Sequence, residues 1–274
     1  MLEIDDLVIL GRAVPVLLKD NRRTICTAGY SEKFGLVRVY PTYYTDNLHQ
    51  WDVVSIKAEI DKRDSRDESW ERDRSTQFEV AGSISQDKKN KETLLQSICE
   101  DICTKDLNQE KVSLAVIKPE ILNFEFIEPK NTDDKGVLAQ TLLDFWENKI
   151  VEKISPVKVK SDFPNIPYID FRCGSSCKVK NPHHQQVLEW GIYRWMENHP
   201  DNIDQVWDNL RLRNNDYYKY FLIGNLRDRR TTWLIISILR GKKNIDMKPS
   251  VKKKVRYRKN EILKDKQTKL DNFD

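Results

Sequence analysis

The first ninety residues alternate between apolar and polar side chains with a period of two, which is the pattern of half-buried β-strands. In WDVVSIKAEI, Val54, Ile56, Ala58 and Ile60 share one face, and polar side chains fill the other. Residues 78–84, FEVAGSI, alternate similarly. Three earlier runs are short, rich in β-forming residues and punctuated by Gly or Pro: residues 5–18, 24–30 and 34–41. Five short strands so close together predict a small β-barrel rather than an α/β sheet.

A charged segment separates two of these strands. Residues 61–74, DKRDSRDESWERDR, contain five basic and six acidic residues. Because the opposite charges nearly cancel, we interpret the segment as a solvated loop or short helix rather than as a binding surface.

Helices and strands are mixed in the rest of the chain. Apolar residues that recur at three and four predict a helix in residues 91–105. Further strands are predicted at 111–119, 120–129 (with Leu122, Phe124 and Phe126 on one face), 166–173, 217–225 and 231–240, and further helices at 136–152, 187–198 and around Val206 and Leu210. The predicted fold is mainly β with inserted helices (α+β). We divide it into a first barrel (1–90), a helical linker (91–110), a second β unit (111–240) and a disordered basic tail (241–274).

Charge and cysteine content restrict the environment and the partners. No stretch approaches the ~18 to 20 apolar residues of a membrane span, and acidic residues stand where a signal peptide carries positive charge. The odd count of five cysteines indicates a reducing, cytoplasmic setting. Residues 240–259 hold ten Lys or Arg against one Asp, which favours a polyanionic partner, although basic tails also serve solubility alone.

Three stretches together resemble the dual OB-containing domain family of prokaryotes. They are ICTAGYSEKFGLVRVYP (25–41), SLAVIKPEILNFEFIEP (113–129), and IPYIDFRC (166–173) with HHQQVLEWGIYRW, YFLIGN and WLIISIL after it. The resemblance covers roughly residues 5–240. It implies two OB-like β-barrels in tandem and a role on nucleic acid, in modification or conflict systems. A fold alone does not establish a function.

An OB barrel binds single strands through a basic groove and aromatic platforms on which bases stack. One candidate cluster lies around residues 38–51 and another around residues 217–230 and the tail, with DNA favoured as the ligand. The candidates are Arg38, Tyr40, Tyr43, Tyr44, Trp51, Tyr218, Lys219, Arg227, Arg229, Arg230, Lys252, Lys253 and Lys254. Aromatic residues at strand ends also fill cores, so we expect fewer than half of these to contact nucleic acid.

Two pairs of cysteines have the same three-residue gap. Cys173, Cys177 and His183 could serve as zinc ligands, although structural zinc sites more often show Cys-x2-Cys and need a fourth ligand. Cys99 and Cys103, on the predicted helix, are interpreted as a small apolar stripe. No other cofactor is indicated.

Signatures of the common enzyme classes are missing from the sequence, so we favour a binding protein. Two alternatives remain open. One is a metal-dependent nuclease or modification factor whose Asp162, Asp170 and Glu189 converge in the fold, and the other is a scaffold that binds only protein.

The last residues, KDKQTKLDNFD, place Gln267, Leu270 and Phe273 at offsets of three. This pattern resembles the peptide by which replication and repair proteins bind the sliding clamp of archaea and eukaryotes. The resemblance implies a polar anchor, an aliphatic plug and an aromatic ring on one face of a short helical turn. Asp274 stands where that peptide has a second aromatic residue, which should weaken docking.

Overall fold

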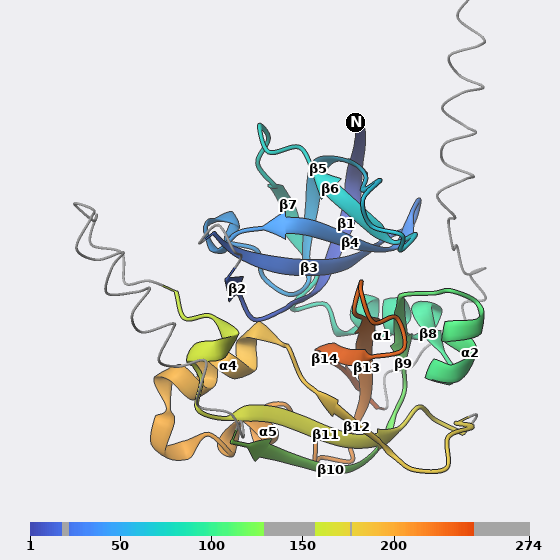
Figure 1. Ribbon diagram of the computed structural model, residues 1–274, viewed down its shortest axis with the longest axis vertical. Coiled ribbons are helices and arrows are strands. Elements are labelled where there is room, and N and C mark those ends of the chain that lie inside the picture. Colours follow the sequence, from blue (N-terminus) through green and yellow to red (C-terminus); the bar gives the residue numbers. More distant parts are fainter. Residues whose placement is uncertain (18–21, 129–156, 176, 244–274) are drawn as a thin grey trace, which may run out of the picture.

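The computed structural model describes residues 1–17, 22–128, 157–175 and 177–243 (Figure 1). It is mainly β with inserted helices, as the sequence predicts. The predicted helix at 136–152 and the tail beyond residue 243 lie outside the described residues. In the part of the chain that the structure describes, no helix has both the length and the apolar composition of a membrane span.

A closed five-stranded barrel forms the first part of the chain. The strand order around it is β1-β3-β4-β6-β5, and β5 pairs again with β1 to close the ring. The pair β4–β6 is parallel, and the other four pairs are antiparallel. This arrangement is compatible with an OB-like barrel. The strands are β1 (Leu2–Arg12), β3 (Arg23–Ser31), β4 (Gly35–Thr42), β5 (Asp52–Ile60) and β6 (Ser69–Arg72).

The fifth barrel strand lies inside the charged segment that the sequence analysis interpreted as a loop or short helix, so that interpretation is wrong. In β6 only Trp70 is apolar, and its ring packs edge-on against Phe34 inside the barrel, with centroids 5.0 Å apart. A strand of four residues with one apolar side chain is too short to show the alternating pattern from which a strand is predicted. The predicted strand at 78–84 exists as β7 (Glu79–Ser83), but it pairs with β5 outside the ring and is exposed along its length. A short β2 (Val16–Leu17) pairs with β3.

The second part of the described chain contains two sheets. A four-stranded sheet has the order β14-β13-β9-β8, and a three-stranded antiparallel sheet has the order β10-β11-β12. A parallel bridge between Val187 and Ile235 connects them. A second closed barrel therefore stays a prediction. The strands are β8 (Cys99–Glu100), β9 (Leu114–Ile117), β10 (Glu120–Ile127), β11 (Ile166–Arg172), β12 (His183–Gln186), β13 (Tyr217–Asn225) and β14 (Trp233–Lys242).

Two local predictions in this part are wrong. The helix predicted at 91–105 is interrupted, because Cys99 and Glu100 pair with β9 as β8. Tertiary pairing overrides the helical pattern at this point. In β10 the register shifts between Ile121 and Asn123, and this bulge turns Leu122 out to solvent while Phe124 still packs on the core. The helices are α1 (Lys88–Ile98), α2 (Thr104–Gln109), α4 (Trp190–Asn198) and α5 (Gln205–Asn209), with 3-10 turns η1 (Tyr44–Asp46), η2 (Lys160–Asp162) and η3 (Pro200–Asn202).

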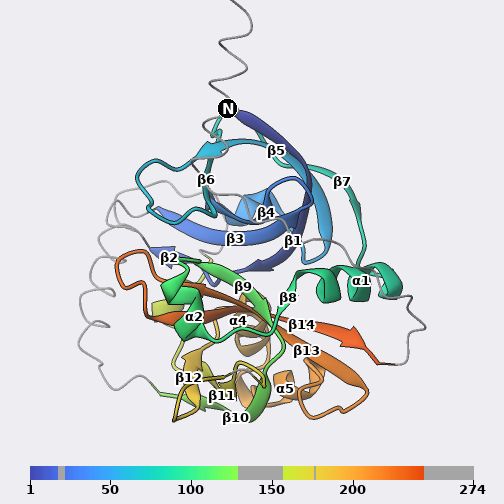
Figure 2. The same ribbon diagram turned by 90° about the vertical axis from the view of Figure 1, so that its right-hand side faces the viewer.

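The barrel and the four-stranded sheet share an apolar core. Figures 1 and 2 show the barrel on one side, the two sheets on the other and α1 at their junction. Leu10 and Trp51 come from the barrel, Leu95 comes from α1, and Leu222 and Ile236 come from β13 and β14. All five are buried, so each part of the chain covers apolar surface of the other. Two further apolar clusters fill the barrel interior and the space between the two sheets and the helices α2, α4 and α5.

Candidate functional site

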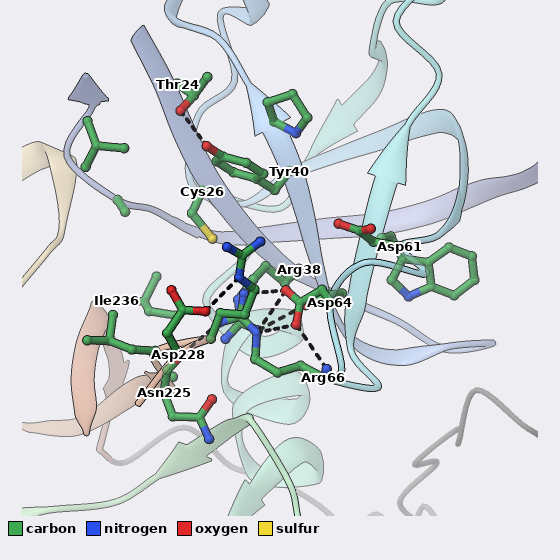
Figure 3. A pocket seen from close by; sticks show the side chains of 18 of the residues that line it. Thr24, Cys26, Arg38, Tyr40, Asp61, Asp64, Arg66, Asn225, Asp228 and Ile236 are labelled. Carbon is green, nitrogen blue, oxygen red and sulfur yellow. Dashed lines mark hydrogen bonds and ion pairs between the residues drawn. The ribbon is translucent and has the colours of Figure 1, made fainter. Parts of the chain in front are cut away.

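A pocket of about 720 Å³ opens where the barrel meets the turn between β13 and β14 (Figure 3). Its walls come from the β1–β3 connection, from β3 and β4, from the β5–β6 connection and from the β13–β14 turn. In an OB barrel, the equivalent strands and connections form the oligonucleotide-binding face. Arginines outnumber aspartates in the lining: Arg22, Arg38, Arg63, Arg66, Arg74, Arg227 and Arg229 stand against Asp61, Asp64 and Asp228.

Strand alternation directs two predicted residues into this pocket. On β4, Val37 and Val39 point into the barrel core, so Arg38 and Tyr40 point outward to the pocket. The Tyr40 hydroxyl lies 2.9 Å from the Thr24 hydroxyl of β3, which fixes the ring at the pocket wall.

The guanidinium of Arg38 forms the inner end of the pocket and joins the two parts of the chain. Only 3% of Arg38 is exposed. It donates to the Ser69 hydroxyl at 3.3 Å and to the carbonyl and hydroxyl oxygens of Ser113 at 3.1 and 3.2 Å. Burial lowers the pKa of Arg38. Arg38 is therefore mainly a structural cation that adds positive potential to the site.

A second cation, the partly buried Arg66, links the β5–β6 connection to the end of β13. Arg66 pairs with Asp64 at 2.5 Å and donates to the Asn225 carbonyl at 2.8 Å. Burial raises the pKa of Asp64, but the hydrogen bonds from Arg66 and Ser69 outweigh it and bring the pKa to about 2. Figure 3 shows Arg38, Asp64 and Arg66 gathered at the centre of the site.

The rim of the pocket carries the cations that solvent can reach. Arg63 pairs with Asp61 and Glu71, and Arg227 contacts Asp228 at 3.1 Å. Arg63 and Arg227 are more than half exposed, and Arg229 is also exposed. Exposed ion pairs are weak, so these guanidinium groups can exchange their partners for a bound anion at little cost.

The structure thus brings Arg38, Tyr40, Arg227 and Arg229 together in one site, although the sequence placed them in two separate clusters. Arg230, which follows them, donates to the Lys111 carbonyl at 3.5 Å.

Other predicted residues lie elsewhere. Trp51 is buried in the core shared by the barrel and the four-stranded sheet. Tyr43 and Tyr44 lie at η1, where Tyr43 packs near the Arg72 guanidinium and Tyr44 is exposed. Lys219 donates to the Asn214 carbonyl.

Tyr218 lines a different pocket, of about 510 Å³, beside Lys118, whose ammonium nitrogen is 3.7 Å from the ring centroid. It stands near the start of β13, whereas the arginine-lined pocket lies at the end of that strand. The predicted Lys252, Lys253, Lys254, Gln267, Leu270 and Phe273 lie outside the described residues.

Sequence reasoning missed the contribution of the charged segment at 61–74. Asp61, Arg63, Asp64, Arg66 and Arg74 all line the pocket. The sequence analysis did not identify these residues as pocket residues, because the near-balance of acids and bases in the segment indicated only a solvated surface. The usable signal was the position of this segment between two barrel strands.

The predicted metal ligands Cys173, Cys177 and His183 do come together, and Cys103 joins them. Burial raises the pKa of Cys173 to about 12. The interpretation of Cys99 and Cys103 as one helical stripe is wrong, because Cys99 lies in β8 and Cys103 is the residue before α2.

The three carboxylates of the nuclease alternative have separate roles. Asp162 accepts a hydrogen bond from the Val159 amide, Asp170 pairs with His184 at 2.6 Å, and Glu189 accepts from the Ile238 amide at 2.6 Å.

One family model matches the chain. It is described as a domain of unknown function (DUF8758), and it matches residues 3–99. This range holds the barrel, β7 and α1 but leaves out the β13–β14 turn of the pocket. No curated protein and no solved structure matches the chain.

Proposed function

We propose that this protein binds single-stranded nucleic acid, with DNA favoured, in the arginine-lined pocket of an OB-like barrel. Its role would be that of an accessory protein in DNA replication or repair or in defence against mobile elements. The observation that carries the proposal is the position of the pocket. It lies on the strands and connections that form the ligand-binding face of an OB barrel, and seven arginines line it.

The chemistry of the lining supports a phosphate backbone as the ligand. Guanidinium groups bind phosphate oxygens through paired hydrogen bonds. Arg63, Arg227 and Arg229 stand at the rim, where a strand that passes across the pocket would meet them. Arg38 is held by neutral serine oxygens and adds positive potential without moving, whereas Asp64 largely balances the charge of Arg66.

Tyr40 supports a base contact beside the phosphates. Its ring is half-buried, lines the pocket and is held through its hydroxyl by Thr24. Base stacking on one such ring contributes roughly 1–3 kcal/mol and does not depend on sequence. The proposed mode is therefore one of weak sequence preference and strong salt dependence.

The test is fluorescence anisotropy with labelled single-stranded DNA, single-stranded RNA and duplex DNA at several salt concentrations. We expect the full chain to bind single strands more tightly than duplex. In Arg227→Ala/Arg229→Ala the affinity should fall, and the slope of log K against log salt should become shallower by about 0.7 for each phosphate that the variant no longer neutralises.

A matched control is Arg194→Ala/Arg213→Ala, which removes one partly exposed and one exposed arginine of the second part of the chain. Equal losses of affinity in both double variants would show that binding depends on net charge and not on this pocket. A chain without salt-sensitive binding to any of the three ligands would refute the proposal and favour a protein-binding scaffold.

The C-terminal peptide adds a separate proposal that rests on sequence alone. Gln267, Leu270 and Phe273 would dock the protein on a sliding clamp. Calorimetric titration of the full chain into the clamp of the source organism should give binding that Leu270→Ala/Phe273→Ala abolishes. Unchanged binding in that variant would exclude this peptide as the docking segment.

A further inference from the structure

Three thiols and one imidazole converge between the start of α2 and the β11–β12 connection. Cys103, Cys173, Cys177 and His183 each offer one ligand atom, and these four atoms lie within 4.8 Å of one another. Nε2 of His183 is 3.1 Å from Sγ of Cys173 and 3.7 Å from Sγ of Cys177. Bonds of ~2.3 Å to sulfur and ~2.0 Å to nitrogen in a tetrahedral zinc site require ligand atoms about 3.5–3.8 Å apart. The observed cluster is close to that arrangement.

The backbone places the three ligands of the β11–β12 connection at defined positions. Cys173 directly follows β11, and Gly174 turns the chain with a φ of 132°. The Cys177 amide donates to the Gly174 carbonyl at 3.3 Å. His183 begins β12, where it stands opposite Phe171 in the β11–β12 register. A tight turn and a strand pair thus aim both thiols and the imidazole at one point.

The fourth ligand arrives from a distant segment. Cys103 immediately precedes α2 and is fully buried, about seventy positions before Cys173. Other contacts hold the two segments together: Lys178 pairs with Asp106 at 2.9 Å, and the Ser175 hydroxyl donates to Asp101 at 2.8 Å.

We propose that Cys103, Cys173, Cys177 and His183 bind one zinc ion. Three sulfur atoms and one nitrogen form a soft ligand set that suits zinc rather than magnesium or calcium. Four protein ligands leave no open position, so the site is structural and not catalytic. Its role is to fasten the segment between α1 and β9 to the three-stranded sheet, and it is independent of the nucleic-acid pocket.

The first test is the zinc content of the purified full chain, measured by plasma mass spectrometry against protein concentration. We expect about one zinc per chain. Cobalt exchanged into the protein should show the ligand-field bands of a tetrahedral site and a thiolate charge-transfer band. Cys103→Ser should lower the zinc content markedly because it removes one of the four ligands, whereas Cys99→Ser, the cysteine four positions earlier, should leave it unchanged.

A second pair of variants keeps the proposal testable if Cys103→Ser does not fold. His183→Ala should lose zinc, His183→Cys should retain it with an altered cobalt spectrum, and His184→Ala should retain it unaltered. His184 is the matched control because its ring contacts Asp170 and Tyr168 instead of the cluster. Three results would overturn the proposal: a protein that neither contains nor takes up zinc, a disulfide within the cluster in freshly purified protein, or equal zinc loss in Cys99→Ser and Cys103→Ser.

Discussion

The carboxylate of Glu92 occupies the place where a side chain on Gly241 would begin. A Cβ built on Gly241 would lie 1.5 Å from Oε2 of Glu92, and Glu92 also accepts a hydrogen bond from the Tyr220 hydroxyl at 2.8 Å. Glu92 belongs to α1 and Gly241 to β14, so this contact fixes the helix after the barrel on the last described strand.

Gly241→Ala should therefore destabilise the protein. The carboxylate is buried and bonded, so it cannot move aside without loss, and we expect the free energy of unfolding to fall by about 1–3 kcal/mol. Urea denaturation measures this change. Gly82→Ala is the control, because no heavy atom lies within 4 Å of a Cβ at that position of β7. Equal effects in the two variants would contradict the importance of this contact.

Two variants of Tyr40 distinguish base stacking on its ring from hydrogen bonding through its hydroxyl. Tyr40→Phe removes only the contact with Thr24 and should retain most of the affinity for single strands, whereas Tyr40→Ala should lose roughly 1–3 kcal/mol of binding free energy. Anisotropy titration at constant salt gives both values. A loss in Tyr40→Phe as large as in Tyr40→Ala would rule out the ring as a platform.

Glu189 makes stability depend on pH near neutrality. Burial raises the pKa of Glu189 to about 7, above its value near 4.5 in the unfolded chain. The contribution of Glu189 to the free energy of unfolding is therefore complete below pH 4.5 and is lost as the pH rises through 7. Glu189→Gln should gain stability relative to the natural chain between pH 5 and pH 8, by about 1–3 kcal/mol. Urea denaturation across this range tests the prediction. The control is Glu197→Gln, a carboxylate within α4 that pairs with Arg194.

Asp64 makes stability depend on pH in the opposite direction. Because the pKa of Asp64 lies at about 2, below the unfolded value of 3.8, its contribution is complete above pH 4 and is lost as pH falls toward 2. Asp64→Asn should cost about 2 kcal/mol at pH 7 and progressively less at pH 4 and pH 3. A cost that does not change with pH would show that the Arg66 ion pair does not set this pKa.

Strong periodic patterns made much of the fold predictable. The alternation in β5 and the long apolar runs of β13 and β14 predict strands that the structure contains. The missed strand β6 has one apolar residue, and the interrupted helix at Cys99 depends on a strand partner that sequence periodicity does not reveal.

The candidate sites were predictable only in part, for a different reason. Arg38 and Tyr40 are recognisable within a predicted strand, and Cys173 and His183 are recognisable on either side of a turn. Arg66 and Cys103 acquire their roles through contacts with distant segments, the Asn225 carbonyl for the former and the β11–β12 connection for the latter. Such long-range juxtapositions leave no local pattern in the sequence.

The apolar core shared by the barrel and the four-stranded sheet has a consequence for the modularity of this chain. The segment covered by the family model ends at residue 99, whereas Leu10 and Trp51 of the barrel are covered by Leu222 and Ile236 from beyond it. A fragment that ends at residue 99 would expose the apolar surface around Leu10 and Trp51 to solvent and would self-associate through it.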